Sequence, residues 1–232
     1  MKSSYYKYFA ALLLFGSNGI VASNINLPSY EIVLLRLLLG SLFLITVFTV
    51  SRQRFTFYRN KHTCLYLFIS ASAMGASWML LYEAYQQVGI SIASLAYYCG
   101  PVIVMILSPF LFRETLTWPK IAGFLTVLAG MCLVNLQALD EGKTIWGLFC
   151  GLMSAFMYAL MVTANKKAKP ESGLENSLLQ LVIGSFIVVA FVSMQKNFVL
   201  SLTTIDWIPV LLLGLLNTGI GCYLYFSSIT NL

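Results

Sequence analysis

The chain has 232 residues, of which 59% are hydrophobic and only 9% are charged. A typical soluble domain has roughly 25% charged residues, so a soluble fold could not bury this much apolar surface. The net charge of +6 would suggest a nucleic-acid partner in a soluble protein. Here the placement of the basic residues in loops explains the charge, and we expect no nucleic acid as a partner.

Eight apolar stretches follow one another along the chain. A transmembrane helix needs about 20 apolar residues, because a rise of 1.5 Å per residue then crosses a hydrocarbon core of roughly 30 Å. The stretches are continuously apolar, whereas strands of a membrane barrel alternate over about 10 residues. The predicted fold class is therefore all-α, a polytopic transmembrane helix bundle. The predicted spans are residues 5–24, 30–50, 63–83, 90–112, 118–136, 145–165, 173–195 and 207–230.

Two ionisable residues lie in the second and third spans. Arg36 lies inside the second span, and Glu83 lies near the outer end of the third, at a similar depth. A charge at this depth needs a partner or a wet cavity, and a charge-assisted pair between the two is geometrically possible. Glu83 would then be a proton-sensing gate, or Arg36 an anchor for a substrate carboxylate. The alternative is a snorkelling arginine with an interfacial glutamate.

Other polar and aromatic side chains also fall within the spans. Cavities for small molecules combine apolar walls with a few polar groups, and tyrosine and tryptophan offer a flat ring with a hydrogen-bonding tip. Near span ends the same residues form interfacial belts, which is the alternative for part of the set. Together with Arg36 and Glu83, the predicted substrate-binding residues are Asn18, Trp78, Tyr82, Tyr97, Tyr158, Asn217 and Tyr223.

Proline and glycine mark the fourth and sixth spans. Pro101 lies in the middle of the fourth span, where a lost backbone hydrogen bond usually kinks a helix. The kink is either a hinge for alternating access or a fixed bend. Glu114, in the next turn, is expected to cap a helix. Gly147 and Gly151 have the GxxxG spacing that lets another helix approach closely; packing within the subunit is favoured, and a homodimer is the alternative.

The basic residues fall in alternate loops. If the N-terminus is cytoplasmic, only Lys143 and Lys196 lie on the outer side, in agreement with the excess of basic residues in short cytoplasmic loops. We therefore expect a multi-pass protein of the cell membrane, in a bacterium the cytoplasmic membrane, with both termini cytoplasmic. The basic residues on the cytoplasmic side are Lys2, Lys7, Arg52, Arg54, Arg59, Lys61, Arg113, Lys120, Lys166, Lys167 and Lys169.

The first three spans return later in the chain as spans six to eight. A unit of five spans crosses the membrane an odd number of times, so a second copy enters from the opposite side as an inverted repeat. We predict a first five-helix repeat over residues 1–137 and an incomplete second repeat of three helices over 138–232. We expect the equivalents of spans four and five to be missing from the second repeat; eight spans as the complete protein is the alternative. A shift of 144 residues pairs Glu31 with Glu175, Leu34 with Leu178, Leu35 with Leu179, Leu37 with Leu181, Gly40 with Gly184 and Ser41 with Ser185.

The stretch from Ala93 to Val134 contains a proline-interrupted span, an acidic residue in a tight turn, and a glycine-bearing span. The residues that carry this pattern are Pro101, Glu114, Leu116, Gly123 and Gly130. A second set lies in the first two spans and consists of Gly16, Ser17, Asn18 and Arg36. On these residues the whole chain resembles the drug/metabolite transporter superfamily, in particular its EamA-type permeases. The resemblance implies ten helices in two inverted halves and the transport of small metabolites, often outward. The sequence departs from it by lacking the last two helices.

The residues of familiar catalytic sites are scarce. His62 is the only histidine and lies in a basic loop, Asp140 and Asp206 lie outside the spans or at an edge, and no HExxH, GxSxG or Walker motif occurs. We therefore expect a protein that is not an enzyme, with no cofactor and no metal. The five cysteines lie within or at the edges of spans, which argues against a disulfide framework.

The leading interpretation is a secondary transporter or facilitator of small organic metabolites, such as amino acids or related compounds. We expect it to export them by alternating access, with a small-molecule substrate and the lipid bilayer as its partners. The alternatives are a membrane-embedded lipid-handling protein or enzyme that uses the same cavity, and an inactive truncated fragment. Polar lining at mid-membrane would favour transport, whereas a lipid-open groove converging on Glu83 would favour lipid chemistry.

Overall fold

The structure is a computed structural model that describes residues 2–113, 117–135, 145–170, 172–194 and 207–229. Within these residues every regular element is a helix, which confirms the prediction of an all-α bundle. The elements are α1 (Lys2–Gly16), α2 (Asn18–Ala22), α3 (Ser29–Val50), the 3-10 helix η1 (Phe57–Arg59), α4 (Lys61–Tyr97), α5 (Cys99–Phe112), α6 (Trp118–Asn135), α7 (Ile145–Ala168), α8 (Gly173–Ser193), α9 (Trp207–Leu211), the π-helix η4 (Leu212–Ile220) and α10 (Gly221–Ile229).

Among the described residues, five helical stretches are long and apolar enough to cross a membrane, which confirms a polytopic helical membrane protein. One of them runs over 52 residues, Lys61–Phe112, and contains the third and fourth predicted spans. It breaks at Gly89, whose φ of 81° is a backbone conformation that glycine adopts without a steric penalty. The first predicted span is interrupted at Ser17, between α1 and α2, and is therefore not one continuous helix. The other four stretches are Ser29–Val50, Ile145–Ala168, Gly173–Ser193 and Trp207–Ile229.

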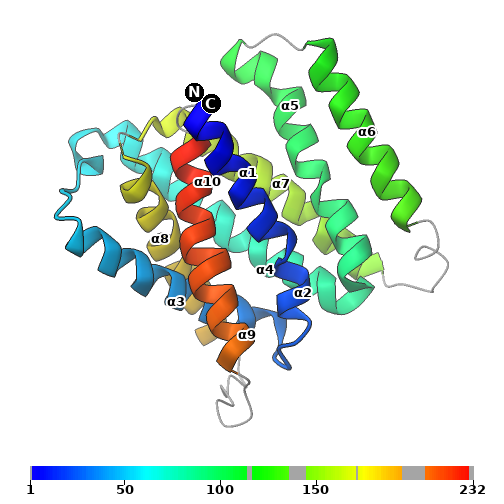
Figure 1. Cartoon of the computed structure of the whole chain (residues 1–232), viewed down its shortest axis with the longest axis horizontal. Coiled ribbons are helices and arrows are strands. Elements are labelled where there is room, and N and C mark those ends of the chain that lie inside the picture. Colours follow the sequence, from blue (N-terminus) through cyan, green and yellow to red (C-terminus); the bar gives the residue numbers. More distant parts are fainter. Residues whose placement is uncertain (1, 114–116, 136–144, 171, 195–206, 230–232) are drawn as a thin grey trace.

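Helices α1 and α10 lie side by side at the front of the bundle in Figure 1. On one side α3 packs against α8, and on the other α5 packs against α7, with α6 beyond it. The long helix α4 runs along α7 and contacts α8 as well. Helix α1 begins and α10 ends at the same end of the bundle (Figure 1), so the two ends of the described chain lie together.

The proline expected to kink the fourth span lies just after a helix break. Pro101 is the third residue of α5, which begins at Cys99. Proline has no N–H to donate to the carbonyl group four residues before it, here that of Tyr97, and its ring crowds that carbonyl group. Helix α4 ends at Tyr97, so the break agrees with the position of the proline. A second interruption lies at Gly89, and a hinge at Pro101 stays a prediction.

The two predicted repeats meet where α3 crosses α8. The hydroxyl oxygens of Ser41 and Ser185, which the 144-residue shift pairs, lie 3.1 Å apart. Around them the contacts are reciprocal. A Cβ on Gly40 would lie 3.1 Å from Leu181 Cδ1, and a Cβ on Gly184 would lie 3.7 Å from Leu37 Cδ2. These reciprocal contacts involve residues that the 144-residue shift pairs with each other.

Glu175, another residue of the repeat, fastens a loop to the beginning of α8. Its carboxylate accepts hydrogen bonds from Thr56 N at 2.6 Å, Thr56 Oγ1 at 2.6 Å and Phe57 N at 2.9 Å. Its own backbone N–H donates to Ser172 Oγ, the N-cap of α8. A carboxylate is also favoured near the positive end of a helix dipole. The loop between α3 and α4 is thus held against α8 by one buried side chain.

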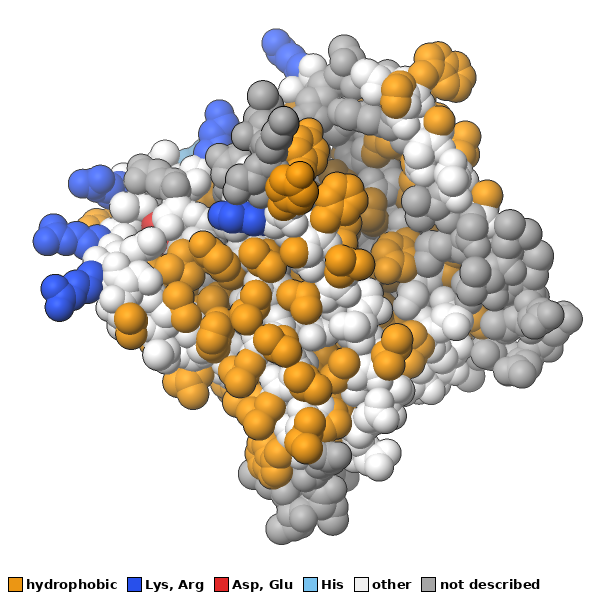
Figure 2. Space-filling model, in the orientation of Figure 1, with side chains coloured by type: hydrophobic (Ala, Val, Ile, Leu, Met, Phe, Trp, Pro, Cys, Tyr) orange, Lys and Arg blue, Asp and Glu red, His pale blue; other side chains and the backbone are white. Residues whose placement is uncertain are grey.

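The surface agrees with a protein that lies in lipid. Hydrophobic side chains cover much of the visible face, and most of the visible lysine and arginine side chains gather at the upper left, where Figure 1 draws the loop between α3 and α4 (Figure 2). The predicted GxxxG pair of α7 is used within the chain, because a Cβ on Gly151 would lie 2.8 Å from the Cβ of Ala96. Outside the described residues lie Glu114, Leu116, Asp140, Lys143, Lys196, Asp206 and the predicted boundary between the repeats at 137–138.

Candidate functional site

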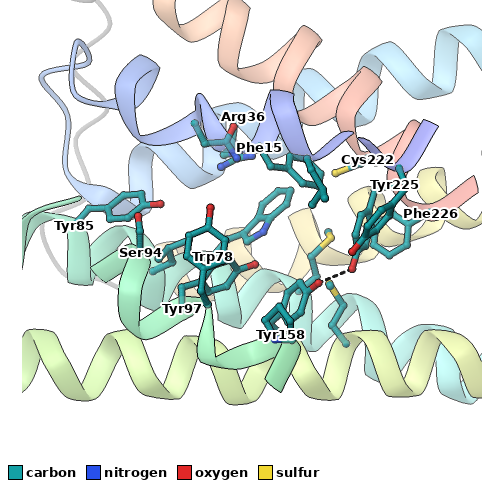
Figure 3. A pocket seen from close by; sticks show the side chains of 18 residues that line it. Phe15, Arg36, Trp78, Tyr85, Ser94, Tyr97, Tyr158, Cys222, Tyr225 and Phe226 are labelled. Atoms are coloured by element: carbon teal, nitrogen blue, oxygen red, sulfur yellow. Dashed lines mark hydrogen bonds between the residues drawn. The ribbon is translucent and has the colours of Figure 1, made fainter. Parts of the chain in front are cut away.

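A cavity of about 260 Å³ lies among α1, α2, α3, α4, α5, α7 and α10 (Figure 3). Its described lining has one formally charged side chain, Arg36, and half of its 18 residues are aromatic. No group of three or more histidine, cysteine, aspartate or glutamate side chains that could hold a metal ion occurs within the described parts of the chain. The lining residues are Tyr8, Leu12, Phe15, Asn18, Arg36, Met74, Trp78, Leu81, Tyr85, Ser94, Tyr97, Tyr98, Pro101, Tyr158, Met161, Cys222, Tyr225 and Phe226.

Arg36 is buried at the edge of this cavity, with only 1% of its surface exposed. Its Nε donates to Thr218 Oγ1 at 2.9 Å, and its Nη1 donates to the Tyr82 hydroxyl at 2.6 Å. Its guanidinium carbon lies 4.0 Å from the centre of the Trp78 ring, close enough for a cation–π interaction. The remaining nitrogen, Nη2, has no hydrogen-bond partner among the described residues. Arg36 is therefore a buried cation whose hydrogen-bond partners are neutral and which has one nitrogen free.

Glu83 does not pair with Arg36, so of the two alternatives for these residues the ion pair is not the one formed. The Glu83 carboxylate accepts hydrogen bonds from Ser29 Oγ at 2.9 Å and from Gln87 Nε2 at 3.1 Å. Successive residues of an α-helix are rotated by about 100°. Trp78 and Tyr82, four residues apart, therefore share the face of α4 that meets Arg36, while Glu83 is turned toward the start of α3.

The π-helix η4 supplies the neutral groups behind Arg36. Thr218 accepts from Arg36 and donates its own hydroxyl hydrogen to Leu213 O at 2.7 Å. The adjacent Asn217 Nδ2 lies 2.9 Å from each of three acceptors at the break between α1 and α2, namely Leu14 O, Ser17 Oγ and Asn18 Oδ1. π-Helical turns occur frequently at functional sites. Here the turn connects the interruption of α1 and α2 with the guanidinium group.

Aromatic rings form the side of the cavity away from Arg36 (Figure 3). The hydroxyls of Tyr158 and Tyr225 lie 2.8 Å apart, which ties α7 to α10. The ring of Tyr97 meets that of Tyr158 edge to face, with the centroids 5.4 Å apart, and Tyr225 packs against Tyr8 and Phe15 of α1. The site therefore combines a cationic edge with an aromatic wall.

The predicted binding residues divide into two groups in the structure. Asn18, Arg36, Trp78, Tyr97 and Tyr158 line the cavity, as does Pro101. Four others are not among the lining residues. Tyr82 holds Arg36, Glu83 bonds to Ser29, Asn217 bonds across the α1–α2 break, and Tyr223 lies under Lys7 Nζ, 5.8 Å from its ring centre.

Sequence reasoning missed several lining residues, and helical spacing would have indicated some of them. Tyr8, Leu12 and Phe15 are spaced i, i+4 and i+7 and so share one face of α1. Tyr85 is at i+7 from Trp78 but lies beyond the predicted end of the third span at residue 83. Cys222 and Phe226 likewise share one face of α10. Polarity within the spans does not indicate these residues, whereas their shared helix faces do.

Comparison with known proteins agrees across most of the chain. The profile of a family described as the EamA-like transporter family matches residues 3–136 and 145–232. A Bacillus subtilis (strain 168) protein named "Uncharacterized transporter YxxF" is 26% identical over 230 residues, which cover 96% of this chain and 72% of that protein. An Acidianus ambivalens protein named "Uncharacterized transporter in sor 3'region" is 27% identical over 130 residues, 56% of this chain and 50% of its own length. One crystal structure shares the fold, with a TM-score of 0.77 at 18% identity over 99% of this chain and 80% of that one.

Proposed function

Because the chain belongs to the EamA-like transporter family, we propose that it is a secondary transporter or facilitator that moves a small organic metabolite by alternating access. The observation that carries this proposal is the cavity of about 260 Å³, enclosed by seven helices and lined by one buried cation and many aromatic rings. The solute binds in this cavity between α3, α4, α7 and α10. The direction is export across the cytoplasmic membrane, with both termini in the cytoplasm.

The contacts between α3 and α8 support alternating access. In an inverted repeat the two units can exchange conformations, and the exchange converts a cavity open to one side into a cavity open to the other. The Ser41–Ser185 contact and the reciprocal glycine–leucine contacts are those of two related units meeting on an axis. The cavity lies beside this crossing, because Arg36 of α3, which lines the cavity, comes one residue before Leu37 and about one helical turn before Gly40.

The position of Glu83 favours transport over lipid chemistry. A lipid-handling site was expected to have a groove converging on this carboxylate. Glu83 is absent from the described lining of the cavity, and its carboxylate accepts hydrogen bonds from Ser29 and Gln87. The polar groups that line the cavity include instead Arg36, Asn18, Ser94 and several tyrosines.

The test of the proposed function is a flux measurement on the purified chain in vesicles. We expect a panel of radiolabelled metabolites to contain at least one that enters vesicles with the protein faster than protein-free vesicles, with counterflow against the unlabelled compound. Counterflow is the signature of a carrier, because a pore gives none. Flux at the protein-free level across the panel, from protein shown to be folded by size-exclusion chromatography, would contradict the proposal.

A disulfide on the symmetry axis is expected to leave transport intact. When two related units exchange conformations, the separation of equivalent residues is the same in both end states. The hydroxyls of Ser41 and Ser185 lie 3.1 Å apart, so the pair Ser41→Cys and Ser185→Cys should oxidise to a disulfide in a background without the five native cysteines. We expect the oxidised protein to retain at least half of the flux of its reduced form, measured in the same vesicles.

The control for this experiment is a cross-link away from the axis. Thr56 and Glu175 touch through Oγ1 and Oε2 at 2.6 Å, but they are not equivalent residues, so exchange does not preserve their separation. We expect a Thr56→Cys and Glu175→Cys disulfide to stop most of the flux and dithiothreitol to restore it. Loss of flux through the Ser41–Ser185 disulfide, with recovery on reduction, would count against exchange about this axis.

A further inference from the structure

We propose that the cavity takes an organic monoanion, a carboxylate on a flat apolar body, and that a zwitterionic amino acid fits it less well. The inference rests on the proposed function, whose substrate class it names. It is carried by the juxtaposition of the free Arg36 Nη2 with the aromatic wall of the same cavity.

The charge of the cavity favours an anionic ligand. Arg36 is the one formal charge in the described lining, and a guanidinium group stays protonated in proteins. A buried cation without an anion is costly, since desolvation is not offset by a Coulombic partner. Glu83 does not supply that anion, because its hydrogen bonds go to Ser29 and Gln87. A bound carboxylate would neutralise the site.

The hydrogen bonds of Arg36 leave one of its nitrogens without an acceptor. Nε and Nη1 are engaged by Thr218 and Tyr82, and the ring of Trp78 covers one face of the group. The guanidinium plane is thereby fixed while Nη2 has no acceptor. Nη2 carries two N–H donors, and a carboxylate that accepts from an ionised donor forms a strong, short hydrogen bond. The protein thus holds the arginine in place and leaves its free donors to a ligand.

The aromatic wall and the volume of the cavity favour a small ligand with a flat apolar body. Tyr97, Tyr158, Tyr225 and Phe15 present rings around the remaining space (Figure 3), and aromatic pairs gain energy beyond burial alone. Pockets for drug-sized ligands have volumes of roughly 300–1,000 Å³, so the cavity of about 260 Å³ suits a smaller molecule. A single ring with a short carboxylate arm meets both conditions.

The absence of a second charge separates a simple anion from an amino acid. An α-ammonium group would bring a positive charge into a cavity whose described lining holds Arg36 and no carboxylate. Like charges at short range disfavour each other strongly in a poorly hydrated site. A carboxylate without the ammonium is therefore preferred to the corresponding amino acid.

The experiment compares four related probes on the purified full chain in lipid nanodiscs. Phenylacetate has the carboxylate, phenylacetamide is its neutral isostere, phenylalanine adds an ammonium group and one carbon, and phenethylamine has the ammonium group without a carboxylate. We expect phenylacetate to bind at least tenfold more tightly than each of the other three by isothermal titration calorimetry. Equal affinities for phenylacetate and phenylacetamide, or tighter binding of phenylalanine, would overturn the proposal.

Two variants test whether Arg36 causes the preference for phenylacetate. Arg36→Gln should remove the preference for phenylacetate over phenylacetamide, whereas Arg54→Gln, on an arginine in an exposed loop, should keep it. A preference that survives Arg36→Gln would overturn the assignment to this residue. Should Arg36→Gln fail to fold, the probe series on the unaltered chain still decides.

The outcome is separable from that of the proposed function, because binding is measured without flux. Tight phenylacetate binding with no flux of any solute would uphold the anion site and contradict transport. Flux of a neutral or cationic solute together with equal binding of all four probes would uphold transport and overturn the anion site.

Discussion

Replacing Arg36 with methionine is expected to reduce carrier flux of an organic anion at least about 30-fold. Removing one partner of a buried, hydrogen-bonded charge pair costs about 2–5 kcal/mol, and about 2 kcal/mol corresponds to roughly 30-fold in affinity. Methionine fills similar space without the charge, so Trp78 and Tyr82 keep an apolar neighbour. The measurement is initial flux of radiolabelled phenylacetate into vesicles, at equal amounts of reconstituted protein.

The same variant should keep or raise the thermal stability of the protein. A buried charge with neutral partners and a free Nη2 is costly in the empty protein, and replacing such groups with apolar residues is often neutral or stabilising. A purely structural arginine would give the opposite result, a lower unfolding temperature. Arg54→Met, the same change on an exposed arginine, is the control and should leave both flux and stability unchanged. Full flux in Arg36→Met would contradict a binding role.

Replacing Gly40 with leucine is expected to destabilise the bundle more than any other single change considered. A Cβ at this position would lie 2.7 Å from Thr218 Cγ2 and 3.3 Å from Gly214 O, and the backbone oxygen can move only if η4 moves. Overpacking of this kind costs typically about 1–3 kcal/mol. Because Thr218 also accepts the hydrogen bond from Arg36 Nε, the displacement should reach the binding site.

The control for Gly40→Leu is Gly123→Leu. Gly123 is exposed on α6, and nothing lies within 4 Å of a Cβ placed there. We expect Gly123→Leu to melt like the unaltered protein in detergent, and Gly40→Leu to melt at a lower temperature or to elute as aggregate in fluorescence-detected size-exclusion chromatography. Equal melting of both variants would show that α3 and η4 are not closely packed.

The helices were predictable to the extent that span length and apolar runs determine them. The stretches Ser29–Val50, Ile145–Ala168 and Gly173–Ser193 lie close to their predicted bounds, because a run of about 20 apolar residues is a direct consequence of bilayer thickness. The break at Ser17 and the π-helical turn at Leu212–Ile220 were not predicted. Both depend on hydrogen bonds between distant segments, such as Asn217 with Ser17, which no local pattern contains.

The binding site was predictable in kind more than in detail. Polar groups inside apolar spans indicated Asn18, Arg36 and Trp78, and these line one cavity. Tyr82 and Glu83 are neighbours in sequence, and both were predicted to bind substrate. One residue along an α-helix corresponds to about 100° of rotation, so the two side chains lie on different faces of α4. Both residues were predicted from their depth in the membrane. Depth carries no information about which face of α4 meets α3.

The contact between Ser41 and Ser185 was not predictable from the sequence. The shift of 144 residues pairs the two residues, but such a pairing says nothing about the distance between them. The 3.1 Å between their hydroxyls follows from the packing of α3 against α8 at Gly40 and Gly184. The inverted repeat itself stays a prediction.

Cysteine accessibility tests most directly whether this cavity opens alternately to the two sides of the membrane, as proposed. Ser94 is a partly buried lining residue, so Ser94→Cys in a cysteine-free background reports on the cavity. We predict that a membrane-impermeant, negatively charged thiol reagent labels this cysteine from either side of oriented vesicles, and that phenylacetate slows both reactions. Labelling from one side only, in protein that carries out flux, would contradict alternating access.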